Sequence, residues 1–221
     1  IRKRFRSIKM RVFKFGGASV KNAAGVRNVA LILQKHAAEK LVIVVSAMGQ
    51  TTNALERVLQ LHQSSRDYRS ELDVLKEYHR QIQGELFQKD NKIFQTVDNL
   101  WVDLETALQK DHPFDVLYDQ VVSFGEVIST VISYHYFLET QFSAEWVDAR
   151  DLIATDKTFH EGKVDWTKSR KNIQRNKEIF KSNKCNFCID LQEKGEDPVC
   201  VATCPLGAIE FGPIEELRKK Y

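Results

Sequence analysis

A lysine followed closely by two glycines lies near the start of the chain, in the run KFGGAS from Lys14 to Ser19. Glycines after a strand let backbone N–H groups approach a phosphate, because no Cβ blocks their access. A lysine at the end of the strand can neutralise charge on a transferred phosphoryl group. The spacing is not that of a Walker A loop. The segment therefore predicts phosphate binding, with an ordinary strand-to-helix turn as the alternative.

Small and hydroxyl-bearing residues form a second group, SAMGQTTN, from Ser46 to Asn53. The group follows the apolar run from Leu41 to Val45, which is typical of a strand in a parallel sheet. Ligands bind at the carboxyl ends of such strands. We therefore predict a ligand-binding loop here, and an ordinary turn capped by Thr52 or Asn53 is the alternative.

Two charged residues, Glu126 and Arg150, are the next candidates. Glu126 follows a glycine inside a long apolar helix, where a buried carboxylate needs a cation such as a substrate ammonium group. Arg150 follows an expected strand and can clamp a carboxylate with two hydrogen bonds. The alternatives are a solvent-facing Glu126 and a surface ion pair between Arg150 and Asp148 or Asp151.

All four cysteines of the chain lie in one C-terminal cluster, which continues into Pro205 and consists of Cys185, Cys188, Cys200 and Cys204. Their clustering favours a metal or iron–sulfur site in a reducing compartment over a disulfide scaffold. Four thiolates at this spacing can hold one [4Fe–4S] cluster or one Zn²⁺ ion. A third alternative is that they bind no metal.

The elements that must position these groups are strands alternating with helices. Apolar patterns predict strands at 11–15, 41–46 and 144–148, and a loop over 148–155. They predict helices over 22–39, with Asn22 as the N-cap, and over 53–62, 68–111 and 114–139. The fold class is thus α/β, an incomplete sheet flanked by helices, with a small Cys-rich ferredoxin-like tail. The strand ends should gather Lys14, Ser46 and Arg150.

Charge and hydropathy exclude several other classes of function. The net charge is +3, but five basic residues gather before Met10, so the basicity is not that of a nucleic-acid-binding face. The longest apolar run is too short to span a membrane, and no apolar segment follows the basic start as in a secretory signal. We therefore expect a cytoplasmic protein that neither binds nucleic acid nor spans a membrane.

The runs KFGGASV, VVSAMGQTTN, SFGEVIST and WVDARDLIATD, in this order, resemble the aspartate kinase family of amino-acid kinases over residues 10–170. The resemblance implies transfer of the γ-phosphate of Mg-ATP to the β-carboxylate of L-aspartate, a step towards lysine, threonine and methionine. It implies catalytic roles for Lys14 and Glu126. It further implies phosphate binding by Lys14, Gly16, Gly17, Ser19 and Ser46, and aspartate binding by Ser46, Ala47, Thr52, Glu126 and Arg150.

The sequence departs from this family after about residue 170. The family continues with a G-R-G-G-S-D-like nucleotide-binding motif and regulatory ACT domains, which this sequence lacks. We therefore expect impaired kinase activity. Residues 184–221 instead resemble the iron–sulfur electron-transfer subunit of dimethyl-sulfoxide-reductase-type enzymes, through KCNFC and PVCVATCP.

The expected organisation has four parts: a basic leader at 1–10, a truncated kinase domain at 11–170, a charged junction at 171–183 and a 4Fe–4S ferredoxin-like module at 184–221. Three functions follow: an aspartate-kinase-like enzyme, an electron-transfer module of a molybdopterin oxidoreductase, or a hybrid without function. The expected partners are aspartate and ATP. The resemblances leave open a homo-oligomer and, for the tail, an oxidoreductase partner.

Overall fold

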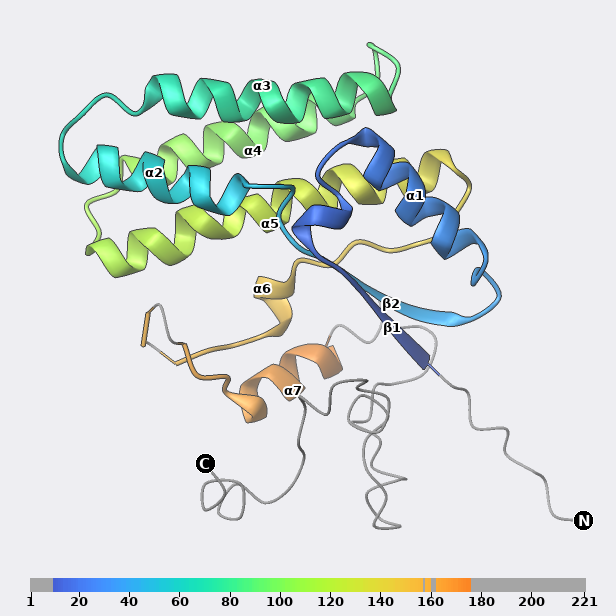
Figure 1. Cartoon of the computed structure of the whole chain (residues 1–221). Helices are drawn as coiled ribbons and strands as arrows, with labels where there is room; N and C mark the ends of the chain where they lie inside the picture. The colour runs from blue at the N-terminus through green and yellow to red at the C-terminus, as the bar shows by residue number, and fades with distance from the viewer. Residues whose placement is uncertain (1–9, 157, 160–161, 176–221) are drawn as a thin grey trace, which may run out of the picture. The chain divides into compact units, whose positions relative to one another are not determined.

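The computed structural model of the chain describes residues 10–156, 158–159 and 162–175 (Figure 1). All of them belong to the first of two compact units, residues 1–179. The four cysteines predicted as metal ligands lie outside the described residues, as do residues 1–9 of the basic leader and most of the predicted junction.

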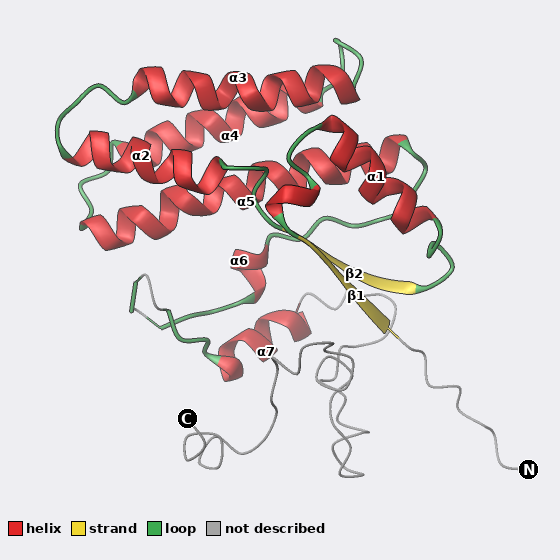
Figure 2. Cartoon of the chain, in the orientation of Figure 1, coloured by secondary structure: helices red, strands yellow, loops and turns green. Residues whose placement is uncertain are grey.

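Two parallel strands open the described part of the chain, β1 (Met10–Phe15) and β2 (Lys40–Val45). They pair in register from Met10 opposite Lys40 to Phe15 opposite Val45. Helix α1 (Ala23–Gln34) connects them, so the three elements form a βαβ crossover unit (Figure 2). The predicted α/β class and the first two predicted strands are confirmed.

The N-terminus of α1 is where the sequence predicts it. The side-chain oxygen of Asn22 accepts a hydrogen bond from the backbone N–H of Gly25 at 2.9 Å, as an N-cap does. The helix ends at Gln34, earlier than the predicted residue 39, and residues 35–38 form turns. Ala37 and Ala38 are exposed, so no buried apolar face continues the helix there.

Four longer helices follow: α2 (Thr51–Gln63), α3 (Arg69–Leu86), α4 (Ile93–Leu108) and α5 (Phe114–Glu139). The predicted helical stretch 68–111 is thus two helices. The break comes before Asn91, whose side-chain oxygen accepts from the N–H of Ile93 at the start of α4. Helix α2 packs against α3 and α5, and α4 packs against α5 (Figure 1).

Helix α5 is the most apolar helix of the described unit. By length and composition it could cross a membrane, but 56% of its most apolar window is buried among the other elements. Val121, Ile128 and Ile132 are fully buried in the core that it shares with α2 and α4. A helix that is apolar nearly all round is expected at such a central position in a folded core.

The prediction of a third strand at 144–148 is wrong. Residues 142–148 connect α5 to a short helix, α6 (Ala149–Leu152), without strand structure, and α6 lies where a loop was predicted. A strand requires a neighbour that pairs with its backbone, and residues 143–147 make no backbone hydrogen bond to other described residues. Helix α7 (Trp166–Arg175) then extends into the predicted junction.

Candidate functional site

The two glycine-containing loops meet at the carboxyl ends of β1 and β2. The carbonyl oxygen of Phe15 accepts from the N–H of Ser46 at 3.0 Å, and that of Gly17 accepts from the N–H of Gly49 at 3.1 Å. Lys14 lies opposite Val44 in the strand register, and its side chain is exposed. The structure therefore joins the KFGGAS and SAMGQTT loops through their backbones, and we call this contact the loop junction.

Glycine is required on both sides of the loop junction. A Cβ on Gly17 would lie 2.6 Å from the carbonyl oxygen of Ala47, too close for any side chain. Gly49 has a φ of +54°, and a Cβ there would lie 2.6 Å from the hydroxyl oxygen of Tyr78. Gly16 differs from both, because a Cβ there would have no atom within 4 Å. The backbone at Gly16 is therefore open to an approaching ligand.

Helix α5 packs directly against the second loop at Gly125. A Cβ on Gly125 would lie 3.1 Å from the Cβ of Ala47 and 3.2 Å from Cγ2 of Thr51. One helical turn further on, the Ser129 hydroxyl donates to the carbonyl oxygen of Ser46 at 2.7 Å. Glu126 is next to this contact, and its side chain is exposed, which is the alternative left open by the sequence. It is accessible to a soluble cation.

Arg150 forms the ion pair that the sequence left open as an alternative. Its Nε lies 3.0 Å from both carboxylate oxygens of Asp148, and its Nη2 lies 2.6 Å from Oδ2. Burial pushes the pKa of Asp148 upward, but hydrogen bonds from the side chain and backbone of Arg150 outweigh it and hold the pKa below its usual value. Nη1 of Arg150 makes no hydrogen bond with another described residue. One edge of the guanidinium group remains available to a ligand.

Contacts with α5 place Arg150 near the other motifs. Its guanidinium carbon lies 5.7 Å from the ring centre of Phe124, which immediately precedes Gly125. The indole N–H of Trp146 donates to the hydroxyl of Thr130 at 3.1 Å, one turn of α5 beyond Glu126. The second and fourth motifs thus contact the third motif in the middle of α5, and the first motif is joined to them through the loop junction.

A cleft of about 570 Å³ opens beside Arg150. Helices α4, α5 and α6 and the segment after α6 line it, with Asp103, Thr106, Ala107, Lys110, Val116, Asp119, Gln120, Ser123, Phe124, Arg150, Thr155 and Phe159. Lys14, Ser46 and Glu126 are not among the lining residues. The cleft therefore reaches the motif site from the side of Arg150 and from Ser123 and Phe124, which begin the SFGEVIST motif.

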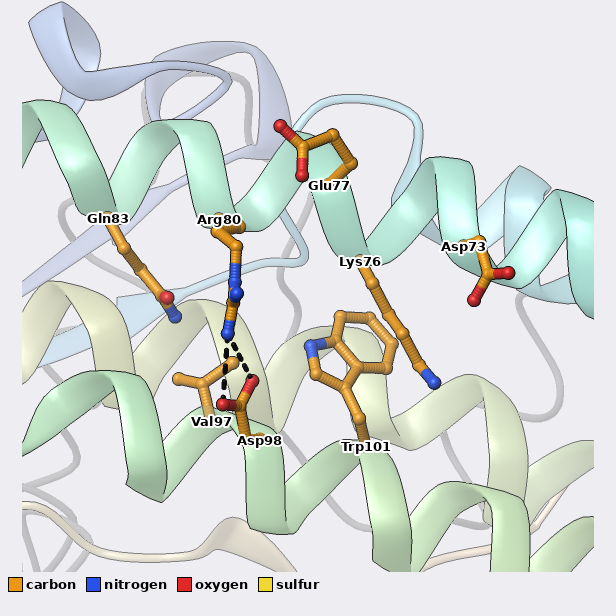
Figure 3. A pocket seen from close by; sticks show the side chains of 8 residues that line it. All are labelled: Asp73, Lys76, Glu77, Arg80, Gln83, Val97, Asp98 and Trp101. Carbon is orange, nitrogen blue, oxygen red and sulfur yellow. Dashed lines mark hydrogen bonds and ion pairs between the residues drawn. The ribbon is translucent and has the colours of Figure 1, made fainter.

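A smaller groove of about 240 Å³ lies between α3 and α4, away from the motifs (Figure 3). Its lining consists of Asp73, Lys76, Glu77, Arg80, Gln83, Val97, Asp98 and Trp101. Arg80 pairs with Asp98 at 3.0 and 3.3 Å across the groove. None of the residues predicted for phosphate or aspartate binding lines it.

Two residues that contact the site were not predicted from the sequence, Tyr78 and His79, and His79 meets Thr51 of the predicted second loop. Thr51 and His79 are buried, and burial lowers the pKa of His79 from 6.5 to about 4, although a hydrogen bond to the carbonyl of Leu75 acts in the opposite direction. In the sequence, Tyr78 and His79 are only two members of an amphipathic pattern. A histidine at a core position was the one available signal.

The predicted cysteine site cannot be placed, because its four residues lie outside the described part of the chain. Among residues 10–156, 158–159 and 162–175, the structure brings together no group of three or more His, Cys, Asp or Glu side chains that could hold a metal ion.

Comparison with known proteins identifies the family. Residues 9–201 match the sequence profile of the amino acid kinase family, so the chain belongs to that family. It is 29% identical, over 154 residues, to the chloroplastic bifunctional aspartokinase/homoserine dehydrogenase 2 of Arabidopsis thaliana, an alignment that covers 66% of this chain and 17% of that one.

The fold of the described region is also found in solved structures. Escherichia coli aspartokinase III in complex with aspartate and ADP superposes with a TM-score of 0.67 at 23% identity, covering 79% of this chain and 39% of that one. The described region therefore has an aspartokinase-like fold. The chain spans about a fifth of the length of the curated plant relatives that it matches.

A separate similarity covers the C-terminal segment. Over 38 residues the sequence is 55% identical to a polypeptide of the anaerobic dimethyl sulfoxide reductase of Escherichia coli strain K12. This alignment covers 17% of this chain and 18% of that polypeptide. The amino acid kinase match extends to residue 201, into the cysteine cluster.

Proposed function

We propose that this chain binds L-aspartate and the phosphates of Mg-ATP as part of an aspartate kinase. The observation that carries the proposal is the loop junction. It brings an exposed lysine, an open glycine backbone and the loop beginning at Ser46 to the same end of the two strands. The family match and the aspartokinase-like fold support a phosphotransferase.

The phosphate side of the proposed site is formed by Lys14, Gly16, Gly17, Ser19 and Ser46. Lys14 would offset the negative charge that spreads over the transferred phosphoryl group. The open backbone at Gly16 admits a phosphate oxygen.

In the reaction, an oxygen of the aspartate β-carboxylate attacks the γ-phosphorus. The bond from that phosphorus to the β–γ bridging oxygen breaks, and ADP leaves with the electron pair.

The aspartate side of the proposed site is formed by Ser46, Ala47, Thr52, Glu126 and Arg150. The exposed carboxylate of Glu126 would attract the substrate ammonium group. Asp148 occupies the Nε side of the Arg150 guanidinium group, which leaves Nη1 to donate to a substrate carboxylate. The ion pair would thus orient Arg150 for the substrate.

Isothermal titration with L-aspartate tests this assignment. We expect Arg150→Ala to weaken binding by about tenfold or more, the effect of losing a hydrogen bond to a charged group. The matched control is Arg80→Ala, which removes another exposed, ion-paired arginine that lines the groove between α3 and α4, and it should leave affinity unchanged. Equal affinity for aspartate in the parent protein and Arg150→Ala would refute the role of Arg150.

A comparison of two ligands isolates Glu126. Succinate lacks the ammonium group of aspartate, so Glu126→Gln should weaken aspartate binding several-fold and leave succinate binding unchanged or stronger. A similar loss for both ligands would exclude an ammonium contact at Glu126.

Turnover is a second, more demanding test. We expect the chain as given to phosphorylate aspartate slowly or not at all, because positioning supplies most of phosphoryl-transfer catalysis and the sequence has no G-R-G-G-S-D-like motif. Lys14→Ala should abolish any aspartate-dependent release of ADP that is present. Full turnover by the chain would contradict the expected need for that motif.

The cysteine cluster supports a second proposal, an iron–sulfur site on Cys185, Cys188, Cys200 and Cys204 with Zn²⁺ as the alternative. The similarity to a dimethyl sulfoxide reductase polypeptide over 38 residues favours it. Iron, sulfide and zinc should be measured on anaerobically prepared protein. About four irons and four sulfides per chain are expected for a cubane cluster. The homo-oligomer, the oxidoreductase partner and the domain boundaries near 170 and 184 also stay predictions.

A further inference from the structure

We propose that two adjacent residues of α3, Tyr78 and His79, are positioning residues that hold both loops of the kinase site in place. We call them the Tyr78–His79 brace. The inference rests on the proposed function, because it assigns to these residues the support of the loops that would bind phosphate and aspartate. Neither residue belongs to the four motifs, and α3 is a separate element from those that contain them.

Tyr78 contacts the segment that follows the first loop and packs against the second loop. Its hydroxyl donates to the carbonyl oxygen of Lys21, in the segment between Ser19 and α1. The hydroxyl oxygen of Tyr78 also lies 2.6 Å from the position that a Cβ on Gly49 would occupy. One side chain therefore touches the second loop and the segment that follows the first loop, and the glycine at position 49 makes room for it.

His79 contacts the second loop through Thr51. Its Nδ1 lies 2.9 Å from the carbonyl oxygen of Leu75, so this nitrogen carries the proton of the neutral ring. Its Nε2 is then an acceptor and lies 3.3 Å from the hydroxyl oxygen of Thr51. That hydroxyl donates its one hydrogen mainly to the carbonyl oxygen of Met48, at 2.6 Å, so its contact with Nε2 is the weaker of the two. The Thr51 hydroxyl thus links α3 to the turn that precedes α2.

The His79 side of the brace is buried and backed by α4, whereas Tyr78 is half-buried. His79 is 0% exposed and Thr51 is 1% exposed. Helix α4 directs the ring of Trp101 towards α3 (Figure 3). This ring meets the His79 ring edge-on, with 5.4 Å between the ring centres and 68° between the ring planes. Removing the partner of a polar group this deeply buried destabilises the folded protein, because water cannot replace that partner. We therefore expect a change in the brace to alter the stability of the second loop.

Amide hydrogen exchange on the unliganded protein, followed by NMR, tests the brace. Thr51→Val removes the hydroxyl and keeps a branched side chain. We expect exchange at the amides of Gly49 and Thr51 to accelerate about fivefold, the effect of losing one net hydrogen bond, while amides in α4 stay unchanged. Thr96→Val in α4, whose hydroxyl also bonds a backbone carbonyl, is the control and should leave both loops unchanged.

A second variant and a ring signal complete the test. Tyr78→Phe should accelerate exchange at Gly49, and it covers the case in which Thr51→Val does not fold. The ¹⁵N spectrum of the His79 ring should show a neutral ring protonated on Nδ1, with an Nε2 signal that shifts in Thr51→Val. Exchange that rises equally throughout the protein, or not at all, would overturn the brace, as would a proton on Nε2.

Aspartate titration of the same variants separates this inference from the proposed function. Thr51→Val and Tyr78→Phe should each weaken aspartate binding a few-fold, although neither removed hydroxyl is assigned a contact with the ligand. If exchange changes in the variants but the parent protein binds no aspartate, the brace stands and the proposed function is refuted. If the parent protein binds aspartate but exchange is unchanged in the variants, the proposed function stands and the brace is refuted.

Discussion

The loop junction and the segment around Arg150 are built in different ways. At the junction, backbone hydrogen bonds join Phe15 to Ser46 and Gly17 to Gly49, and glycines allow the close contact. Arg150 is held by side chains, through its ion pair with Asp148 and its contact with the ring of Phe124. Changes at the junction should therefore alter the stability of the fold, whereas changes at Arg150 should alter ligand binding alone.

The largest effect should come from Gly17→Ala. The added methyl group would meet the carbonyl oxygen of Ala47, a backbone atom that cannot move away without opening the loop junction. We expect a loss of about 3 kcal/mol in the free energy of unfolding, the upper end of the usual cost of overpacking. Urea unfolding measures it.

The matched control for this change is its neighbour. Gly16→Ala places the same methyl group in open space, and the φ of Gly16, −73°, suits an alanine. It should change the stability by less than about 0.5 kcal/mol. Equal losses in the two variants would show that the loops do not touch as described.

The second effect is the dependence of stability on pH through His79. Burial lowers the pKa of His79 from 6.5 to about 4, so the folded state favours the neutral ring. Between these two values the unfolded chain binds a proton that the folded chain does not. The contribution of His79 to the free energy of unfolding is complete above pH 6.5. It is lost as the pH falls towards 4, and the loss is roughly 3 kcal/mol in total.

His79→Gln tests this contribution, because glutamine does not titrate and its side chain can still accept a hydrogen bond. The difference in unfolding free energy between the parent and His79→Gln should shrink as the pH falls from 6.5 to 4. Burial also lowers the pKa of His135, which acts in the same direction but is present in both proteins. A difference that is constant with pH would mean that His79 is not buried as a neutral ring.

The sequence predicted the parts of the fold that depend on local patterns. The Asn22 cap, the strand at 41–46 and the bounds of α5 follow from residue types within a few positions of one another. The strand at 144–148 failed because a strand depends on its neighbour as much as on its own residues. The apolar residues there contact side chains instead, as Trp146 does with Thr130.

The candidate site shows the same division. The close contact at Gly125 could be expected, because a glycine inside an apolar helix requires a reason. The brace could not, because Tyr78 contacts Lys21 across 57 positions of the chain. For Arg150 the sequence left two roles open, an ion pair and a substrate clamp, and the ion pair with Asp148 is the one that the structure contains.

The third effect concerns Arg150→Lys, which keeps the charge and removes the planar fork. Lysine cannot bond Asp148 and a substrate carboxylate with the same geometry, so aspartate binding should weaken about fivefold, roughly 1 kcal/mol. The unfolding free energy should not change, since Arg150 is exposed. A stability loss larger than the binding loss would remove the contrast between the two regions.

The smallest effect is a gain. Gly84 lies in α3, where an added Cβ would have no atom within 4 Å. Gly84→Ala should therefore raise the unfolding free energy by about 0.5–1 kcal/mol, the helix propensity difference, and leave aspartate affinity as it is. Thermal and urea unfolding would both detect the gain. A loss of stability here would mean that α3 packs differently at this position.

We propose above that the loop junction, Glu126 and Arg150 together form an aspartate site. A two-dimensional NMR titration with L-aspartate tests it most directly. We expect saturable shifts at the amides of Ser46 to Thr52, at Gly125 and Glu126, and at Arg150, with the amides of the groove between α3 and α4 unaffected. Shifts confined to that groove, or no saturable shift anywhere at millimolar aspartate, would contradict it.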